Sequence, residues 1–154
     1  MKIFVDADAC PVKQEVIQLA AKYSLTVVFV FSISHSGNLQ LKADVNNVEL
    51  VMVDNESQAA DMAIMNRVSA KDIVITGDYG LASIVLSKKT AAISYNGYCY
   101  DEKNIDKLLY ERHLSSEIRR SGGRVKGPAK RSKQENLKFL AALNSVILKK
   151  MKDI

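Results

Sequence analysis

Short apolar runs alternate with helix-forming segments along the first two thirds of the chain, and this alternation constrains the fold most. The runs of strand length are residues 2–6, 25–31, 48–53, 72–76 and 90–95. The helical segments are residues 11–23, 57–68 and 80–89, and polar residues 32–47 are expected to form a loop. Strands that alternate with helices build βαβ units. We therefore predict an α/β fold, a three-layer sandwich with a mostly parallel five-stranded sheet.

The last third of the chain follows another pattern. Residues 104–120 are predicted to be helical, but their apolar side chains fall on two faces, so we expect a break or kink. One face carries Ile105, Leu108 and Leu109, and the other carries Tyr110, Leu114 and Ile118. A basic, glycine-rich loop (119–131) follows, and the capping box of Ser132 and Glu135 predicts a final helix over 132–151 packed on the body. We expect residues 1–154 to form a single domain.

Charge is divided unevenly along the chain. Residues 1–102 contain 8 Lys and Arg against 12 Asp and Glu, whereas residues 103–154 contain 14 against 5. An acidic front and a basic tail suggest that the acids hold cations and the bases hold phosphates. No apolar run is long enough to span a membrane, and the first residues, MKIFVDADAC, lack the pattern of a signal peptide. With only two cysteines, a cytoplasmic protein that does not bind membranes is expected.

Several aspartates come directly after predicted strands. Asp6 and Asp8 follow the first strand, Asp54 ends the third, and Asp78 follows the fourth. Asp61 is a lone charge in the apolar helical stretch AADMAIM. Because ligands bind at the carboxyl ends of parallel strands, we expect Asp6, Asp8, Asp61 and Asp78 to face one another, with Asp54 nearby. A plainer reading remains open, in which Asp8 and Asp78 cap helices and Asp61 marks a solvated stripe.

Carboxylates gathered in one cleft repel one another, and a hard divalent cation relieves that repulsion. We therefore predict that Asp6, Asp8, Asp61 and Asp78 hold Mg²⁺ or Mn²⁺ and form the catalytic centre. The basic loop would hold a polyanionic partner, with RNA as the expected one. Its predicted contacts are Arg119, Arg120, Arg124, Lys126, Lys130 and Arg131. A solvated linker is the alternative interpretation of this loop.

Two other functions fit parts of the sequence. Asp6 and Asp8 form the D-x-D that opens haloacid-dehalogenase phosphatases, but the aspartate pair expected near the fourth strand is missing. A non-catalytic module that binds RNA through the basic loop is the other alternative. Cys10 is expected to be a buried structural cysteine, and the two histidines, His35 and His113, lie in contexts that suggest no role.

Several motifs together resemble the YaiI/YqxD family of uncharacterised bacterial proteins. They are DADACPV, AADMAIM, DIVITGDYGLA, NGYCYDEKNIDKLLYERH and RRSGGRVKGPAK, and they run over nearly the whole chain. That family is grouped by resemblance with PIN-like domains, a superfamily of small α/β nucleases. The resemblance thus implies a parallel sheet and metal-dependent cleavage of RNA or DNA by clustered acids.

The resemblance also implies roles for individual residues. Asp6 would match the acid after the first strand and Asp61 the acid near the start of the later helix. Asp78 would match the acid after the fourth strand, with Thr76 as its neighbouring hydroxyl and Gly77 between them. PIN nucleases have a further acid on an intervening helix, for which Asp8 or Glu56 is the available substitute. Taken together, the sequence predicts a Mg²⁺- or Mn²⁺-dependent nuclease acting on RNA.

Overall fold

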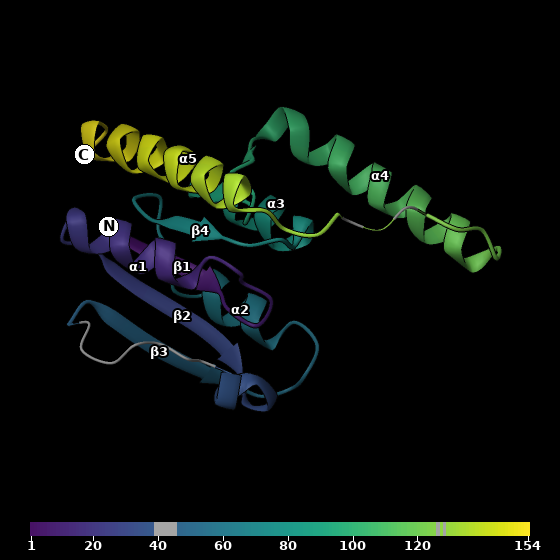
Figure 1. Ribbon diagram of the computed structural model, residues 1–154, viewed down its shortest axis with the longest axis horizontal. Helices are drawn as coiled ribbons and strands as arrows, with labels where there is room; N and C mark the ends of the chain where they lie inside the picture. The colour runs from purple at the N-terminus through teal and green to yellow at the C-terminus, as the bar shows by residue number, and fades with distance from the viewer. Residues whose placement is uncertain (39–45, 126, 128) are drawn as a thin grey trace.

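The computed structural model describes residues 1–38, 46–125, 127 and 129–154. Its strands are β1 (Lys2–Asp6), β2 (Thr26–Ser32), β3 (Val48–Val53), β4 (Ile73–Ile75), β5 (Ala91–Ile93) and β6 (Cys99–Tyr100). Its α-helices are α1 (Lys13–Lys22), α2 (Ala59–Met65), α3 (Tyr79–Ser87), α4 (Glu102–Arg120) and α5 (Lys133–Lys152). The α/β alternation that the apolar runs predicted is confirmed (Figure 1).

The strands form one sheet in the order β3-β2-β1-β4-β5-β6. All neighbours are parallel except β6, which pairs antiparallel with β5. The predicted sheet of five strands is therefore one strand short. The sixth strand was missed because it has only two residues, Cys99 and Tyr100, too few to show a hydrophobic period.

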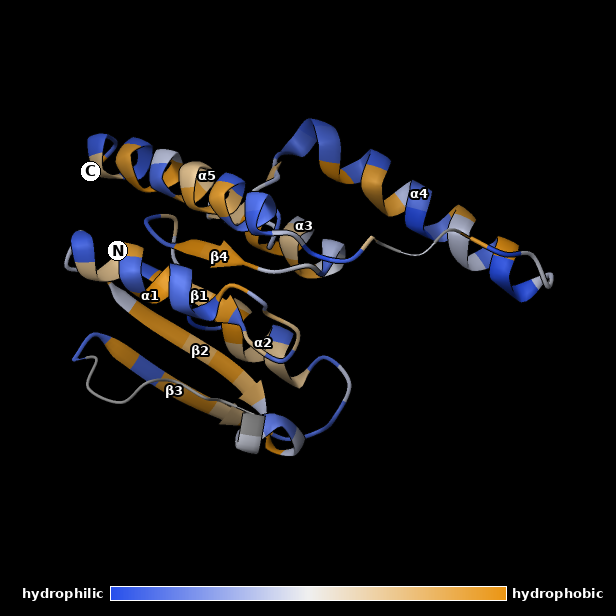
Figure 2. Cartoon of the chain, in the orientation of Figure 1, coloured by the Kyte–Doolittle hydropathy of each residue, from blue (hydrophilic) through white to orange (hydrophobic). Residues whose placement is uncertain are grey.

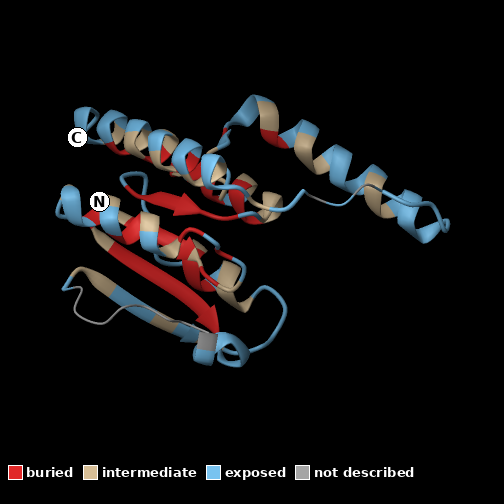
Figure 3. Cartoon of the chain, in the orientation of Figure 1, coloured by how far each residue is buried: buried red, intermediate tan, exposed pale blue. Residues whose placement is uncertain are grey.

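Helices cover both faces of the sheet, as expected for buried parallel strands. On one face, α1 and α5 bury apolar side chains against β1, β2 and β4, among them Val16, Phe139 and Leu143. On the other face α2, α3 and the start of α4 do the same, among them Ile64, Leu81 and Ile105. The central strands are apolar and buried along their length (Figures 2 and 3). The predicted three-layer sandwich is thus confirmed.

Two local predictions differ from the structure. The stretch predicted as a loop begins with a short 3₁₀ helix, η1 (Ile33–Asn38), and residues 39–45 lie outside the described part. The helix over 104–120 is uninterrupted, and only its first half packs against the body, beside α3. Ile105 is buried, whereas Tyr110, Leu114 and Ile118 stay exposed on the part that extends away from the body (Figure 1). The second apolar face therefore required no kink.

The last helix packs on the body as predicted, and a glycine turn fixes its position. The capping box at its start is present, with the Glu135 carboxylate accepting from the Ser132 backbone N–H at 3.4 Å. Gly97, in the turn before β6, has φ +82°, a left-handed conformation that favours glycine. A Cβ there would lie 3.0 Å from the Lys138 carbonyl oxygen and 3.1 Å from the Ala142 Cβ. The turn therefore lies directly against the α5 backbone.

Candidate functional site

The sheet order creates a crevice between the ends of β1 and β4. These strands are neighbours, but the chain continues from β1 toward β2 and β3, and from β4 toward β5 and β6. Connections that leave in opposite directions open a crevice at the carboxyl ends of the two strands. Asp6 is the last residue of β1, and Thr76, Gly77 and Asp78 follow β4 directly. Three of the predicted residues, Asp6, Gly77 and Asp78, therefore border this crevice, and the buried Thr76 lies behind them.

Thr76 connects the two aspartates of the crevice. Its side chain is buried, and its hydroxyl donates to Asp6 Oδ2 at 3.0 Å. The Thr76 hydroxyl oxygen in turn accepts from the Asp78 backbone N–H at 3.0 Å. Asp78 is also the N-cap of α3, because its Oδ1 accepts from the backbone N–H groups of Gly80 at 2.8 Å and Leu81 at 3.2 Å. The capping interpretation of Asp78 is thus correct, and the cap lies at the edge of the crevice.

Arg112 of α4 lies at the same place. A cavity of about 410 Å³, the β1/β4 crevice from here on, is lined by Asp6, Gly77, Asp78, Arg112 and two tyrosines. The Arg112 Nη1 lies 3.7 Å from the Asp78 Oδ1. A guanidinium beside carboxylates can contact the phosphate of a substrate that enters between them.

Asp61 lies close enough to the crevice for the charges of Asp78 and Asp6 to act on its carboxylate. It lies in the first turn of α2 and lines a second cavity of about 450 Å³ together with Asp78 and Arg112. Partial burial, with the negative charges of Asp78 and Asp6, raises the pKa of Asp61 to about 6. Burial also raises the pKa of Asp6, the Thr76 hydroxyl lowers it, and the charges of Asp8 and Asp78 raise it further. Asp78 and Asp6 are therefore close enough to Asp61 to destabilise its ionised form.

Asp8 and the remaining predicted acids lie in that second cavity, which we call the β3 cavity. The Asp8 Oδ1 accepts from the Ser32 backbone N–H at 2.9 Å, and its Oδ2 lies 3.7 Å from His35 Nδ1. The His35 ring is also 2.8 Å from the Ser32 hydroxyl. Asp54 and Glu56 are exposed at the same cavity. Asp8 therefore does not line the crevice that holds Asp6, and it does not cap α1, whose N-cap is Val12.

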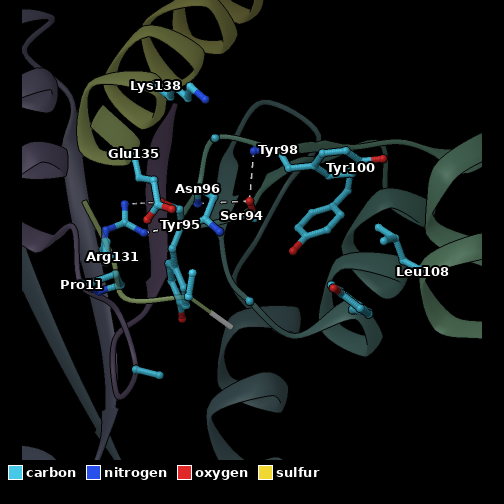
Figure 4. Close-up of a pocket in the computed structure, with 15 residues that line it drawn as sticks. Pro11, Ser94, Tyr95, Asn96, Tyr98, Tyr100, Leu108, Arg131, Glu135 and Lys138 are labelled. Carbon is cyan, nitrogen blue, oxygen red and sulfur yellow. Dashed lines mark hydrogen bonds between the residues drawn. The ribbon is translucent and has the colours of Figure 1, made fainter. Parts of the chain in front are cut away.

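The basic segment is less uniform than predicted. Arg119 and Arg120 end α4, and Arg124 and Lys130 are exposed in the segment that follows. Lys126 lies outside the described residues. Arg131 is engaged within the protein, donating to Asn96 Oδ1 at 2.6 Å and to the Tyr95 carbonyl oxygen at 2.7 Å; Figure 4 shows these three residues together. It also donates to Asn136 Oδ1 at 2.6 Å. Its guanidinium therefore ties the turn after β5 to the start of α5.

The donors around the crevice fit a hard cation in kind. Carboxylate and hydroxyl oxygens are the ligands that Mg²⁺ and Mn²⁺ prefer, and a cation would relieve the repulsion that, after burial, contributes to the raised pKa of Asp61. Within residues 1–38, 46–125, 127 and 129–154, however, no three His, Cys, Asp or Glu side chains are grouped closely enough to hold an ion. The acids surround the crevice without converging on one point.

Sequence reasoning missed Arg112 and the tyrosines around the crevice. Arg112 follows the buried Ile105 by seven residues and Leu108 by four, so it continues the packed face of α4 as a charge. A charged residue on the otherwise apolar face of this helix was the sequence signal that could have identified Arg112. Tyr95, Tyr98 and Tyr100 are three aromatic residues within six positions, in the stretch that forms the turn after β5 and then β6.

Cys10 has the buried position that the sequence predicted. This burial raises the pKa of its thiol to about 11, so the thiol stays protonated at neutral pH and a structural role is supported. Among the described residues, no helix combines the length and apolar character needed to cross a bilayer.

The fold and the site together define the class: an α/β domain with a mostly parallel sheet and with two aspartates, Asp6 and Asp78, at the crevice between the ends of β1 and β4. The chain belongs to the uncharacterized bacterial YaiI/YqxD family, whose model matches residues 4–149. A UPF0178 protein of Alkaliphilus metalliredigens (strain QYMF) is 41% identical over 153 residues, covering 99% of this chain and 96% of the relative. One of Bacillus cereus is 43% identical over 147 residues, covering 96% of this chain and 99% of that relative.

One solved structure also matches over almost the full length. The crystal structure of Rae1 (YacP) from Bacillus subtilis aligns with a TM-score of 0.44 and 18% identity, covering 99% of this chain and 92% of Rae1. At this level of similarity nothing about the site or its chemistry follows from the match.

Proposed function

We propose that this protein is a Mg²⁺- or Mn²⁺-dependent nuclease that hydrolyses phosphodiester bonds of single-stranded RNA. The observation that carries the proposal is that Asp6, at the end of β1, and Asp78, after β4, line one crevice, while Asp61 of α2 lines the adjoining β3 cavity and is influenced by the charges of both. Burial, together with the negative charges of Asp78 and Asp6, raises the pKa of Asp61 to about 6, and pKa values perturbed in this way cluster at functional sites.

The carboxylates of Asp6 and Asp78, which line the crevice, would hold the ion together with water and phosphate oxygens of the substrate. Asp61, which lines the β3 cavity, would act on the site through its charge. A bound Mg²⁺ or Mn²⁺ supplies activation of the attacking water and stabilisation of the charge on the leaving oxygen. Thr76 orients the Asp6 carboxylate, and the backbone of α3 orients the Asp78 carboxylate. Arg112, beside Asp78, would contact the non-bridging oxygens of the phosphate and hold it in the crevice. Asp8, which lines the neighbouring cavity, would complete the acid set only indirectly, through its charge on Asp6.

The other two candidate functions receive less support. A phosphatase that uses Asp6 as nucleophile and Asp8 as acid needs both at one substrate, yet Asp6 lines the β1/β4 crevice and Asp8 lines the β3 cavity. A purely RNA-binding module leaves the repulsion among the crevice acids without a use. Its contacts would be the exposed Arg119, Arg120 and Arg124, which we retain as backbone contacts of the nuclease.

The test is cleavage of an end-labelled single-stranded RNA by the full chain, with Mg²⁺, Mn²⁺ or EDTA. Asp78→Asn should retain the fold, because asparagine also caps helices, and should lose at least about 100-fold in rate. The matched control is Asp106→Asn, which removes one charge from an exposed position of α4 and should cleave like the wild type. The proposal fails if no ion supports cleavage, or if Asp78→Asn cleaves as fast as the control.

A further inference from the structure

Beside the crevice lies a larger cavity, which is lined by tyrosines. It has a volume of about 1010 Å³, at the upper end of the ~300–1,000 Å³ of ordinary ligand pockets. Its aromatic residues are Tyr79, Tyr95, Tyr98 and Tyr100. Figure 4 shows Tyr98 and Tyr100 on one side of this tyrosine cavity, and Arg131, Glu135 and Lys138 on the other.

The tyrosine cavity opens directly beside the acids. It shares four lining residues with the β1/β4 crevice, which are Ala9, Gly77, Tyr79 and Tyr95. The Tyr95 ring lies directly against the backbone of Gly77, and glycine permits this because a Cβ there would lie only 3.0 Å from the ring. A ligand that fills both spaces would pass over Gly77.

Two of the tyrosines are fixed to the acid-bearing strand ends. The Tyr95 hydroxyl donates to the Asp6 carbonyl oxygen at 2.7 Å, and the Tyr100 hydroxyl donates to the Thr76 carbonyl oxygen at 3.3 Å. Burial raises the pKa of Tyr100 to about 12, so its ring stays neutral beside the carboxylates. The aromatic wall is therefore held in a set position relative to the crevice.

The other two tyrosines leave aromatic surface available to a ligand. Tyr98 is 48% exposed, and its ring packs edge-on against Tyr100 with centroids 5.9 Å apart. Tyr79 packs against Tyr100 in the same manner at 6.0 Å. A hydroxyl lies beside them: the Ser94 side-chain oxygen accepts from the backbone N–H groups of Tyr98 at 3.0 Å and Asn96 at 3.2 Å. The exposed Lys138 adds a positive charge at the rim.

We propose that the tyrosine cavity is a base-binding subsite, in which a nucleobase of a single-stranded nucleic acid stacks on Tyr98 while its phosphate lies in the β1/β4 crevice. This inference rests on the proposed nuclease function and adds to it the part of the substrate that is recognised. Flat aromatic rings stack on any base, so the subsite selects unpaired strands over duplex, whose bases are already stacked. Arg131 orients the wall through Asn96 and Tyr95 and does not itself bind the phosphate.

The test is binding without cleavage. Fluorescence anisotropy with labelled hexauridine in EDTA measures affinity for the full chain, and a strand of the same length with abasic residues measures the backbone contribution. Base–aromatic stacking is worth about 1–3 kcal/mol per base, so Tyr98→Ala should weaken hexauridine binding roughly 5- to 150-fold. The same variant should leave binding of the abasic strand unchanged.

Two further variants separate stacking from general damage. Tyr98→Phe keeps the ring and should bind like the wild type, and Tyr110→Ala, at a 62% exposed position of α4 outside the cavity, should also bind normally. The inference is overturned if hexauridine does not bind, if Tyr98→Ala binds it normally, or if the abasic strand binds as tightly. Competition by uridine 5′-monophosphate as strong as that by unlabelled hexauridine would also overturn it, because the ligand would then be a free nucleotide.

These outcomes are independent of the nuclease test. Base-dependent binding without any metal-dependent cleavage would refute the proposed function and leave the base subsite in place. Cleavage that is lost in Asp78→Asn, together with base-independent binding, would refute the subsite and leave the nuclease.

Discussion

Removal of the Asp61 charge should stabilise the metal-free protein at neutral and basic pH. Asp61 ionises at a pKa of about 6 in the folded protein, against 3.8 for an ordinary aspartate, because it is partly buried and faces Asp78 and Asp6. Its carboxylate form is therefore disfavoured by folding. Asp61→Asn keeps the shape of the side chain and removes the charge, so the variant no longer bears this cost.

The sign and size follow from linkage between protonation and folding. From about pH 4 to about pH 6 the folded state binds more protons at Asp61 than the unfolded chain does. The contribution of Asp61 to the free energy of unfolding therefore falls as pH rises through this range and stays constant above it. The full difference in pKa would correspond to about 3 kcal/mol at 1.36 kcal/mol per pH unit. Since Asp61 is partly solvated and its interactions are screened, we expect about 1 kcal/mol.

The assay is urea unfolding of both proteins at several pH values from about 4 to 8, in EDTA to remove divalent ions. The free energy of unfolding of Asp61→Asn should exceed that of the wild type by about 1 kcal/mol at pH 8, and the difference should shrink toward zero at pH 4. Asp106→Asn serves as control, since its position is exposed and no pH-dependent difference is expected. A variant that is equally or less stable at pH 8 would refute the reasoning that repulsion in the crevice acts on Asp61.

Two further predictions concern the turn that carries the tyrosine cavity. Gly97→Ala should lower stability by about 1–3 kcal/mol, because φ +82° is strained for alanine and the added Cβ meets the α5 backbone. Thermal melting checks this, with Gly37→Ala as control because a Cβ there meets nothing within 4 Å; equal melting of the two variants would contradict it. Arg131→Ala should lose about 1–3 kcal/mol with its three hydrogen bonds, whereas Arg120→Ala, at an exposed helix end, should melt like the wild type. An Arg131→Ala melting temperature equal to that of Arg120→Ala would show that the tie is dispensable.

Local patterns in the sequence were sufficient for the sheet and for its flanking helices. Apolar runs such as residues 25–31 can be satisfied only by burial on both faces, and the intervening segments have helical composition, so a parallel sheet between helices was the available solution. The same local reasoning located Asp6 and Asp78 at strand ends, because a charge cannot continue a buried strand.

Where sequence reasoning failed, the deciding contacts were short or lay between distant segments. β6 has two residues, so its pairing with β5 depends on a turn and not on a period. The two apolar faces of α4 predicted a break, because the sequence does not show that half of this helix extends beyond the sheet. Asp8 was expected beside Asp6, but the chain directs it toward Ser32 and η1.

The sequence by itself determined the layered α/β architecture and the strand-end acids, since these follow from burial and from periodicities within a few residues. Only the tertiary structure decided which side chains meet there. Arg112 reaches Asp78 from 34 positions along the chain, and Tyr95 reaches the Asp6 backbone from 89 positions away. Such contacts depend on how helices and turns pack, and each energy is small beside the burial that drives folding, so the pattern of residues carries little trace of them.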